Sequence, residues 1–259
     1  MTAELRSTFD GSTMVLTISN PEHRNALGPE MYAAGVEALS AAESNPEVRC
    51  VVLTGEGEVF CAGGNLQRLQ ANRQKPPQVQ AQSIESLHNW VEAIRAFPKP
   101  VVAAVEGPAA GAGFSLALAC DLVVAARTAV FGMAYSSGAL SPDGGGSWSL
   151  ARALPRQLAA ELLLGGERIG AQRLHELGVV GRLCDAGQAL GTALAWADQL
   201  GARAPNAMAS IKELLSEADR NDLPTQLALE REHFVRNLHH PNAGIGIAAF
   251  LARQVPRYE

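Results

Sequence analysis

The sequence predicts an α/β fold with a helical C-terminal part. Apolar, β-branched runs of strand length alternate with amphipathic stretches of helix length over the first two thirds of the chain. After residue 189 the pattern is helical only. Such alternation is typical of a sheet covered by helices, and a purely helical tail indicates an appended layer. We therefore predict a core over residues 1–200 and a helical C-terminal region over residues 201–259.

The overall composition indicates an ordinary globular protein. The chain has 259 residues, of which 47% are hydrophobic and 18% charged, enough for one large domain. A net charge of −5 without any Lys/Arg block argues against a nucleic-acid partner. No apolar run reaches the roughly 18 residues that span a bilayer, and no apolar leader begins the chain, so we expect no membrane partner. The four cysteines are dispersed in apolar segments, which favours reduced thiols and a cytoplasmic location.

The first hundred residues predict a hairpin, two helices and a strand. Residues 5–18 enclose Asp10-Gly11 and predict the hairpin, and Pro29 begins a predicted helix that runs to about Ala42. Residues 48–54 predict a buried strand. Residues 68–82 are polar and contain Pro76-Pro77, which predicts a mobile surface segment. Residues 83–97 predict an amphipathic helix.

The rest of the chain is organised around residues 100–125. Residues 101–105 suit a strand buried on both faces, a glycine-rich turn follows at Gly111–Gly113, and residues 114–120 predict a tightly packed helix. Backbone N–H groups at a helix start have no partner inside the helix, and the helix dipole places partial positive charge there. The turn therefore predicts a site for an anion, or for an oxygen that becomes one during a reaction. Residues 59–66 form a second apolar-to-glycine stretch with exposed N–H groups.

The second half continues the alternation and then becomes helical. Residues 121–125, 129–132 and 179–184 predict strands, and residues 148–154, 155–164 and 171–177 predict helices. A loop of small residues covers 135–146. The helical end is interrupted at Pro205, Pro224 and Pro241.

Five segments together carry a resemblance to a known family. They are residues 24–27 (RNAL), 51–55 (VVLTG), 60–66 (FCAGGNL), 100–107 (PVVAAVEG) and 120–122 (CDL). In order and spacing, across essentially the whole chain, they resemble the crotonase superfamily, which is the enoyl-CoA hydratase/isomerase family. The resemblance implies a ClpP/crotonase-like spiral of ββα units with a C-terminal helical trimerisation region. It also implies homotrimers, often paired into hexamers as dimers of trimers.

The resemblance further implies an acyl-CoA substrate whose thioester carbonyl lies between two backbone N–H groups. By motif position these belong to Gly64 and Ala112. The family usually has glycine at the second place, but alanine keeps the N–H. Neighbouring residues implied to contact the substrate are Ala62, Gly63, Asn65, Leu66 and Gly111. Coenzyme A enters as part of the substrate, and no separate cofactor is expected.

The sequence departs from the hydratase pattern at the two positions where that pattern has glutamates. Those positions hold Ser115 and Tyr135, neither of which can act as a carboxylate base. The remaining carboxylate is Asp143, as in the aspartate-dependent isomerases of the superfamily such as the epoxyphenylacetyl-CoA isomerases. We therefore expect Asp143 to move a proton between the α- and γ-carbons of an enoyl-CoA. The alternative is that Asp143 caps the next helix or only forms a Pro-Asp-Gly turn.

Three other functions stay open at this point. The chain could be a hydratase that activates water in another way, or an acyl-CoA-binding protein without catalysis. A hydrolase could use Ser115 with Asp185 and His233, since residues 113–117 resemble a nucleophile elbow. The position of Ser115 a full turn inside the predicted helix, and Ala117 in place of the last glycine, disfavour that reading.

Three side chains have both a functional and a structural interpretation. Tyr135 either donates a hydrogen bond to the substrate or lines the pocket, and Trp148 either flanks the acyl group or packs in the core. Arg24 resembles a position whose basic side chain meets the CoA phosphates, or is a surface charge. The six histidines show no metal-ligand spacing, and residues 111–116 lack the third glycine of a dinucleotide fingerprint, so we expect no metal and no nucleotide cofactor.

Overall fold

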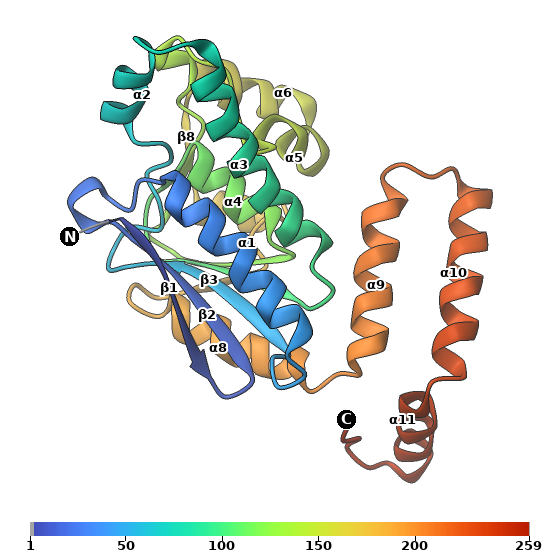
Figure 1. Cartoon of the computed structure of the whole chain (residues 1–259). Helices are drawn as coiled ribbons and strands as arrows, with labels where there is room; N and C mark the ends of the chain where they lie inside the picture. The colour runs from blue at the N-terminus through green and yellow to red at the C-terminus, as the bar shows by residue number, and fades with distance from the viewer. Residues whose placement is uncertain (1–2, 259) are drawn as a thin grey trace.

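The computed structural model describes residues 3–258 and is built around a six-stranded sheet (Figure 1). The strand order is β1-β2-β3-β4-β6-β9. The hairpin β1–β2 is antiparallel and every other pairing in this sheet is parallel. The strands are β1 (Glu4–Asp10), β2 (Thr13–Ser19), β3 (Cys50–Gly55), β4 (Val101–Val105), β6 (Leu122–Ala126) and β9 (Arg182–Cys184).

Helices cover both faces of this sheet, as the continuous apolar strands predict. Val52 and Val102 lie on the face that packs against α8 (Ala189–Gly201). Leu53 and Ala103 point to the opposite face, which packs against α1 (Pro29–Ser44), α3 (Pro77–Ala96) and α4 (Ala112–Ala119). Because successive side chains of a strand alternate between faces, a run such as residues 101–105 is buried throughout.

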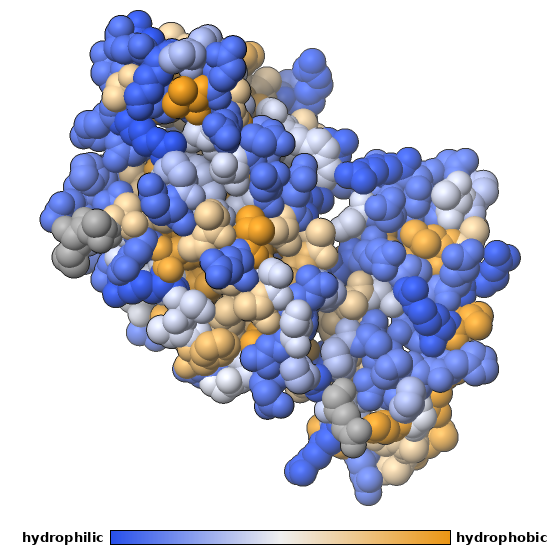
Figure 2. Space-filling view, in the orientation of Figure 1, coloured by the Kyte–Doolittle hydropathy of each residue, from blue (hydrophilic) through white to orange (hydrophobic). Residues whose placement is uncertain are grey.

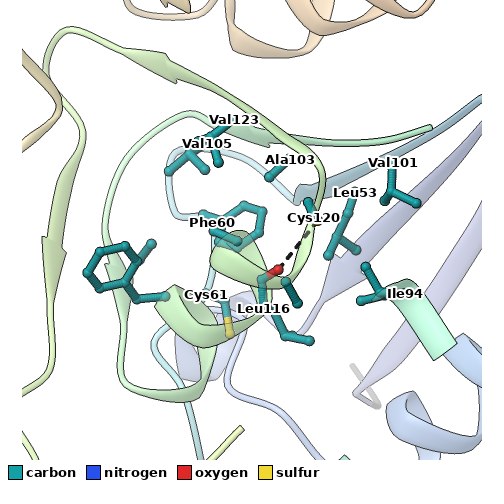
Figure 3. Close-up of a cluster of buried hydrophobic side chains, with 14 of the residues drawn as sticks. Leu53, Phe60, Cys61, Ile94, Val101, Ala103, Val105, Leu116, Cys120 and Val123 are labelled. Carbon is teal, nitrogen blue, oxygen red and sulfur yellow. Dashed lines mark hydrogen bonds between the residues drawn. The ribbon is translucent and has the colours of Figure 1, made fainter. Parts of the chain in front are cut away.

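The helix α4 lies inside the larger core. Figure 3 shows Leu116 of α4 and Phe60 among the buried side chains that surround it. Phe114 is also buried and contacts Phe131, with ring centroids 4.9 Å apart. A helix that is apolar on all sides must be enclosed. The surrounding core thus fixes the start of α4 in place.

A second, three-stranded sheet joins distant parts of the chain next to α4. It has the order β5-β7-β8, with β5 at Ala109–Ala110, β7 at Val130–Gly132 and β8 at Arg168–Gly170. The sequence predicts β7 but not β5 or β8, which are too short to show a period. The pairing of β5 with β7 brings the glycine-rich turn at residue 111 beside the loop that follows β7.

The segment at residues 68–82, predicted as a mobile surface segment, is largely exposed and is helical over most of its length. The structure has α2 at Leu66–Asn72, and α3 begins at Pro77, six residues before the expected start. Proline is compatible with the first helical turn, where its missing N–H has no partner to lose. A hydrogen bond of 2.8 Å from the Arg68 guanidinium to the Ser83 hydroxyl joins the two helices.

Shorter helical elements complete the core; the sequence predicts those over residues 148–177 in outline, but not the short helical turns at residues 21–23 and 136–138. They are η1 (Pro21–His23), η2 (Ser136–Gly138), α5 (Gly146–Ala153), α6 (Arg156–Ala160), a π-helical turn η3 (Glu161–Gly165) and α7 (Ala171–Glu176).

The C-terminal helices α9 (Pro205–Ala218), α10 (Leu223–Leu238) and α11 (Pro241–Ala252) extend beside the core (Figure 1). The three prolines that the sequence shows as interruptions lie in the first turns of these helices and begin them. No helix in the described part of the chain is long and apolar enough to cross a membrane.

Candidate active site

The first glycine turn, residues 61–65, is held by backbone hydrogen bonds on both sides. The N–H of Ala62 donates to the carbonyl of Arg24 at 3.0 Å, and the N–H of Leu27 donates to the carbonyl of Gly63 at 2.8 Å. Gly63 has a φ of +87°, which favours glycine. The N–H of Gly64 has no acceptor among residues 3–258. The turn therefore presents one free, rigidly placed donor.

The second turn has the same property at the start of α4. The N–H of Gly111, whose φ is +53°, donates to the carbonyl of Gly132 at 2.9 Å, and the helix begins at Ala112. The N–H of Ala112 also has no hydrogen-bond acceptor within the described residues. As the first residue of a helix, it lies at the positive end of the helix dipole.

The two turns interlock through glycines. A Cβ atom on Gly63 would lie 2.7 Å from the carbonyl oxygen of Ala110 and 3.3 Å from the nitrogen of Ala112. A Cβ atom on Gly113 would lie 2.5 Å from the carbonyl oxygen of Cys61. Only glycine permits this close approach. The free donors of Gly64 and Ala112 are thus fixed relative to each other.

Both donors line one cavity of about 470 Å³. A cavity of this size suits a small-molecule site. Its lining is mostly apolar with a few polar groups, and includes Leu27, Tyr32, Ala62, Gly63, Gly64, Asn65, Leu66, Arg68, Leu69, Ala110, Gly111, Ala112, Tyr135, Leu140, Pro142 and Asp143. Two N–H donors that face one cavity can stabilise an oxyanion.

The polar segment 68–97, which the sequence suggests shapes the pocket without showing its conformation, provides one wall of the cavity through α3. Gln80, Ser83, Ile84, Leu87 and His88 line the cavity from one side. Their spacing of three and four residues places them on one helix face.

Asp143 and Tyr135 both line the cavity and contact each other there. The Tyr135 hydroxyl donates to Oδ1 of Asp143 at 2.6 Å. Among the described residues that line the cavity, Asp143 is the only carboxylic acid. Burial raises the pKa of the Tyr135 hydroxyl above its ordinary value, and the Asp143 carboxylate raises it further. Tyr135 is therefore a proton donor in a hydrogen bond and not a base.

The interpretation of Asp143 as a helix cap does not hold. Gly145 caps α5, and no side chain accepts a hydrogen bond from the first turn of that helix. The backbone carbonyl of Asp143 does form the turn, accepting from the N–H of Gly146 at 3.1 Å. The Asp143 side chain is thus available for another role, because it forms its hydrogen bond with Tyr135 and not with the helix.

Ser115 is buried behind the cavity wall and does not line the cavity. Its hydroxyl donates to the backbone carbonyls of Asp143 at 3.0 Å and Gly111 at 3.3 Å. The hydrolase alternative lacks the required geometry, because His233 contacts Arg236 and Glu213 on the C-terminal helices. A nucleophile needs a base within hydrogen-bond reach.

The other expected contact residues divide into two groups. Ala62, Gly63, Asn65, Leu66 and Gly111 line the cavity. Asn65 also caps α2, since its side chain accepts from the N–H of Arg68 at 3.0 Å.

Arg24 and Trp148 lie outside the cavity lining. The Arg24 side chain is exposed, while its backbone holds the first turn. The Trp148 ring lies between the guanidinium groups of Arg95 and Arg152, at 4.3 and 4.1 Å from the ring centroid. Trp148 therefore makes cation–π contacts in this structure and does not line the cavity.

Two further titratable groups adjoin the cavity. Burial raises the pKa of the Tyr32 hydroxyl to about 12. Burial also raises the pKa of the Cys61 thiol to about 12, so this thiol is neutral, and its sulfur accepts the N–H of Gly63 at 3.3 Å. Over residues 3–258 no group of three or more His, Cys, Asp or Glu side chains is arranged to hold a metal ion.

The chain is similar to known proteins in both sequence and structure. A sequence model described as enoyl-CoA hydratase/isomerase matches residues 8–259. The 1,2-epoxyphenylacetyl-CoA isomerase of Escherichia coli is 37% identical over 97% of both chains, and an enoyl-CoA hydratase of Mycobacterium tuberculosis is 33% identical over 96% of this chain and 94% of the relative. A crystal structure of an enoyl-CoA hydratase from a Polaromonas species is 70% identical, with a TM-score of 0.98 over 99% of this chain and 100% of the other.

Proposed function

The chain belongs to the enoyl-CoA hydratase/isomerase family and has the crotonase fold, and from this premise we propose that it isomerises an enoyl-CoA, with Asp143 as the acid/base. The thioester oxygen would accept hydrogen bonds from the N–H groups of Gly64 and Ala112. These donors would stabilise the negative charge that develops when the α-proton leaves. The loss of one such donor costs about 3–4 kcal/mol of barrier in other enzymes.

The proposed reaction moves one proton and one double bond. The Asp143 carboxylate removes a proton from the α-carbon of a 3-enoyl-CoA, and the electron pair of that C–H bond delocalises into a dienolate. The resulting carboxylic acid returns a proton to the γ-carbon, so the double bond moves to the 2,3 position and the carboxylate is restored. Coenzyme A is part of the substrate in this proposal, and no separate cofactor takes part.

The observation that carries this proposal is the single carboxylate in the cavity. Asp143 is the only acid among the described lining residues, and it lies in the same cavity as both free N–H donors. Hydration by a pair of carboxylates has no second acid here, because Ser115 and Tyr135 occupy the other two positions. One base is sufficient for an allylic shift, since the same group can remove and return the proton.

The substrate class follows from the relatives and the cavity. The E. coli relative is named as a 1,2-epoxyphenylacetyl-CoA isomerase. The cavity here is lined by leucines, an isoleucine and two tyrosines, and could hold a ring. We therefore include epoxyphenylacetyl-CoA-type thioesters with linear enoyl-CoA esters as candidate substrates. The curated relatives also include hydratases, so hydration is the second candidate reaction.

The proposed assembly is a homotrimer, alone or paired as a hexamer. Helices α9–α11 carry large exposed apolar side chains, among them Leu215, Phe234 and Phe250. Hydrophobic side chains are visible on the surface of this helical region in Figure 2. An exposed apolar face of this kind supports burial against other copies of the chain. The proposed compartment is the cytoplasm.

The test compares wild type with Asp143→Asn on a 3-enoyl-CoA, a 2-enoyl-CoA and 1,2-epoxyphenylacetyl-CoA in deuterated water. Product masses and double-bond positions are determined by mass spectrometry. We expect wild type to give a rearranged thioester, labelled with deuterium where the proton on Asp143 exchanges with the solvent before it is returned, and Asp143→Asn to lose about 10²–10⁴-fold in kcat. Asp185→Asn is the matched control, because its side chain is 91% exposed, and it should keep wild-type turnover.

Two results would contradict this proposal. Full turnover by Asp143→Asn would remove Asp143 from the chemistry. A hydrated product from both proteins would favour the hydratase alternative, with another group activating water. Tight binding of each thioester without any turnover by wild type would support the non-catalytic alternative for these substrates.

A further inference from the structure

We propose that Tyr135 and Ser115 are positioning residues that together hold Asp143 in one orientation, the first through its carboxylate and the second through its backbone. This inference rests on the proposed role of Asp143. Both residues occupy positions where the hydratase pattern has glutamates. In this chain those positions support the one carboxylate that remains.

The side-chain contact fixes one oxygen of Asp143. The Tyr135 hydroxyl donates to Oδ1 at 2.6 Å, while Oδ2 has no recorded donor among the described residues. The Tyr135 backbone is itself anchored, since its carbonyl accepts from the N–H groups of Gly138 at 2.9 Å and Leu140 at 3.0 Å. One oxygen is thus occupied and the other is available for proton transfer.

The tyrosine ring is wedged against the second glycine turn. A Cβ atom on Gly111 would lie 3.4 Å from the Tyr135 hydroxyl oxygen and 3.4 Å from Cζ of the same ring. The turn that precedes the Ala112 donor therefore also limits where the phenol can lie. This contact couples the position of Asp143 to the position of the oxyanion donors.

The backbone contact fixes the loop that carries Asp143. The Ser115 hydroxyl donates to the Asp143 carbonyl at 3.0 Å. The loop lies directly on this serine, because a Cβ atom on Gly144 would be 3.1 Å from Cβ of Ser115, and one on Gly146 would be 2.7 Å from its Oγ. A side chain as long as glutamate at residue 115 would displace the loop, so the serine and the glycine loop fit only as a pair.

The protonation state of the phenol suits this role. Burial and the neighbouring carboxylate both raise the pKa of Tyr135, so it keeps its proton at working pH. A group that stays protonated cannot replace Asp143 as the base. It can orient the carboxylate, and orientation matters because a misplacement of about 1 Å can cost about 100-fold in rate.

The experiment is a double-mutant cycle with Tyr135→Phe and Asp143→Asn. Phenylalanine keeps the ring and removes only the hydroxyl. We expect Tyr135→Phe to lower kcat by about 10- to 100-fold in the wild-type background, with KM changed less than about twofold. In the Asp143→Asn background the same change should lower the residual rate less than about twofold, because the group it positions is already absent.

Single-turnover deuterium exchange followed by mass spectrometry measures the slow variants. Tyr258→Phe is the matched control, since it loses the same atom from a tyrosine outside the cavity, and it should behave as wild type. Ser115→Ala should lower kcat by a few-fold, again with KM unchanged.

Two outcomes would overturn the inference. Wild-type kcat in Tyr135→Phe would show that the hydrogen bond does not position Asp143. An equal loss in both backgrounds would show that Tyr135 acts on the substrate directly. These failures differ from failure of the proposed function, which would appear as full turnover by Asp143→Asn alone.

Discussion

The core and the C-terminal helices distribute their apolar side chains in opposite ways. Every strand of the central sheet from β2 to β6 is mostly buried, and its side chains pack against helices of the same chain. In α9–α11 the buried residues are polar, namely Ser210, His233 and Asn242, while Phe250 is 84% exposed. The core is therefore complete within one chain, whereas the C-terminal helices present an apolar surface that one chain leaves uncovered.

The two regions are joined by a small number of polar contacts. The Lys212 ammonium of α9 donates to Asp121 at 2.7 Å and to the carbonyls of Ile94 at 3.1 Å and Lys99 at 3.3 Å. Asp121 also accepts from the N–H of Val101 at the start of β4. Apolar packing therefore builds the site within the core. Hydrogen bonds instead orient the C-terminal helices, through which we propose that copies of the chain assemble.

The largest expected effect comes from changing the core at Gly113. In Gly113→Ala the new methyl group would lie 2.5 Å from the Cys61 carbonyl and 2.7 Å from its Cβ, so the two turns must separate. We expect the free energy of unfolding to fall by about 1–3 kcal/mol or more, as is typical of overpacking. We also expect turnover to fall at least about 100-fold, because the two donors are displaced. Urea denaturation and the deuterium assay measure the two effects.

Gly191→Ala is the matched control for that change. Nothing lies within 4 Å of a Cβ atom at Gly191 in α8, so alanine should raise stability by about 0.5–1 kcal/mol and leave turnover unchanged. Equal behaviour of the two variants would show that the interlocked turns tolerate separation.

An intermediate effect is expected where the two regions join. Lys212→Met leaves the Asp121 carboxylate, whose side chain is 28% exposed, without its cation, and we expect a loss of about 1–2 kcal/mol at neutral pH. Burial already raises the pKa of Asp121, and Lys212 opposes that rise, so the variant should raise it further. A carboxyl whose folded pKa exceeds its unfolded pKa stabilises the fold when protonated, and this contribution is lost as pH rises through the folded pKa.

The penalty of Lys212→Met should therefore shrink as pH falls. Denaturation of wild type and variant at pH 7.5 and pH 4.5 measures it, and the difference between the two proteins removes the contribution of the other carboxylates. Adding Asp121→Asn should recover part of the lost stability, because it removes the unpaired charge. A penalty that is the same at both pH values would contradict this account.

At Phe250 we expect the smallest effect on the fold and the largest effect on assembly. Phe250→Glu places a charge on the apolar surface of α11 and should leave the far-UV spectrum and the unfolding midpoint of the core nearly unchanged. Light scattering should report a fall from the mass of three or six 27.2-kDa chains toward that of one. Phe9→Glu, the same change at an exposed phenylalanine of β1, should not reduce the mass below a trimer. An unchanged mass in Phe250→Glu would place the assembly surface elsewhere.

The local sequence was sufficient to predict the long elements but not the short ones. The hairpin β1–β2, the helix that begins at Pro29 and the buried strand β4 all follow from apolar periodicity and turn residues. The strands β5 and β8 were missed, since two or three residues carry no period. Pro76-Pro77 indicates a break in the sequence, so the expected helix begins at residue 83, whereas in the structure α3 begins at Pro77.

The candidate site shows the same division. Gly64, Ala112 and Asp143 were identified from motif positions, and all three line one cavity. The contact of Tyr135 with Asp143 and the placement of Trp148 between two arginines do not follow from the sequence. Each depends on which segments meet in space, and the sequence separations of 8 residues for Tyr135–Asp143 and 53 for Arg95–Trp148 do not specify that.

The sequence by itself determined the local conformational preferences of this protein. It supplied glycines at most of the positions where φ is positive, apolar strands and prolines at helix starts. Only the tertiary structure decided which donors remain free, which residue donates a hydrogen bond to Asp143 and which apolar surface stays uncovered. The physical reason is that propensity and periodicity act within one turn or one strand, whereas hydrogen-bond satisfaction and burial depend on every segment packed around a group.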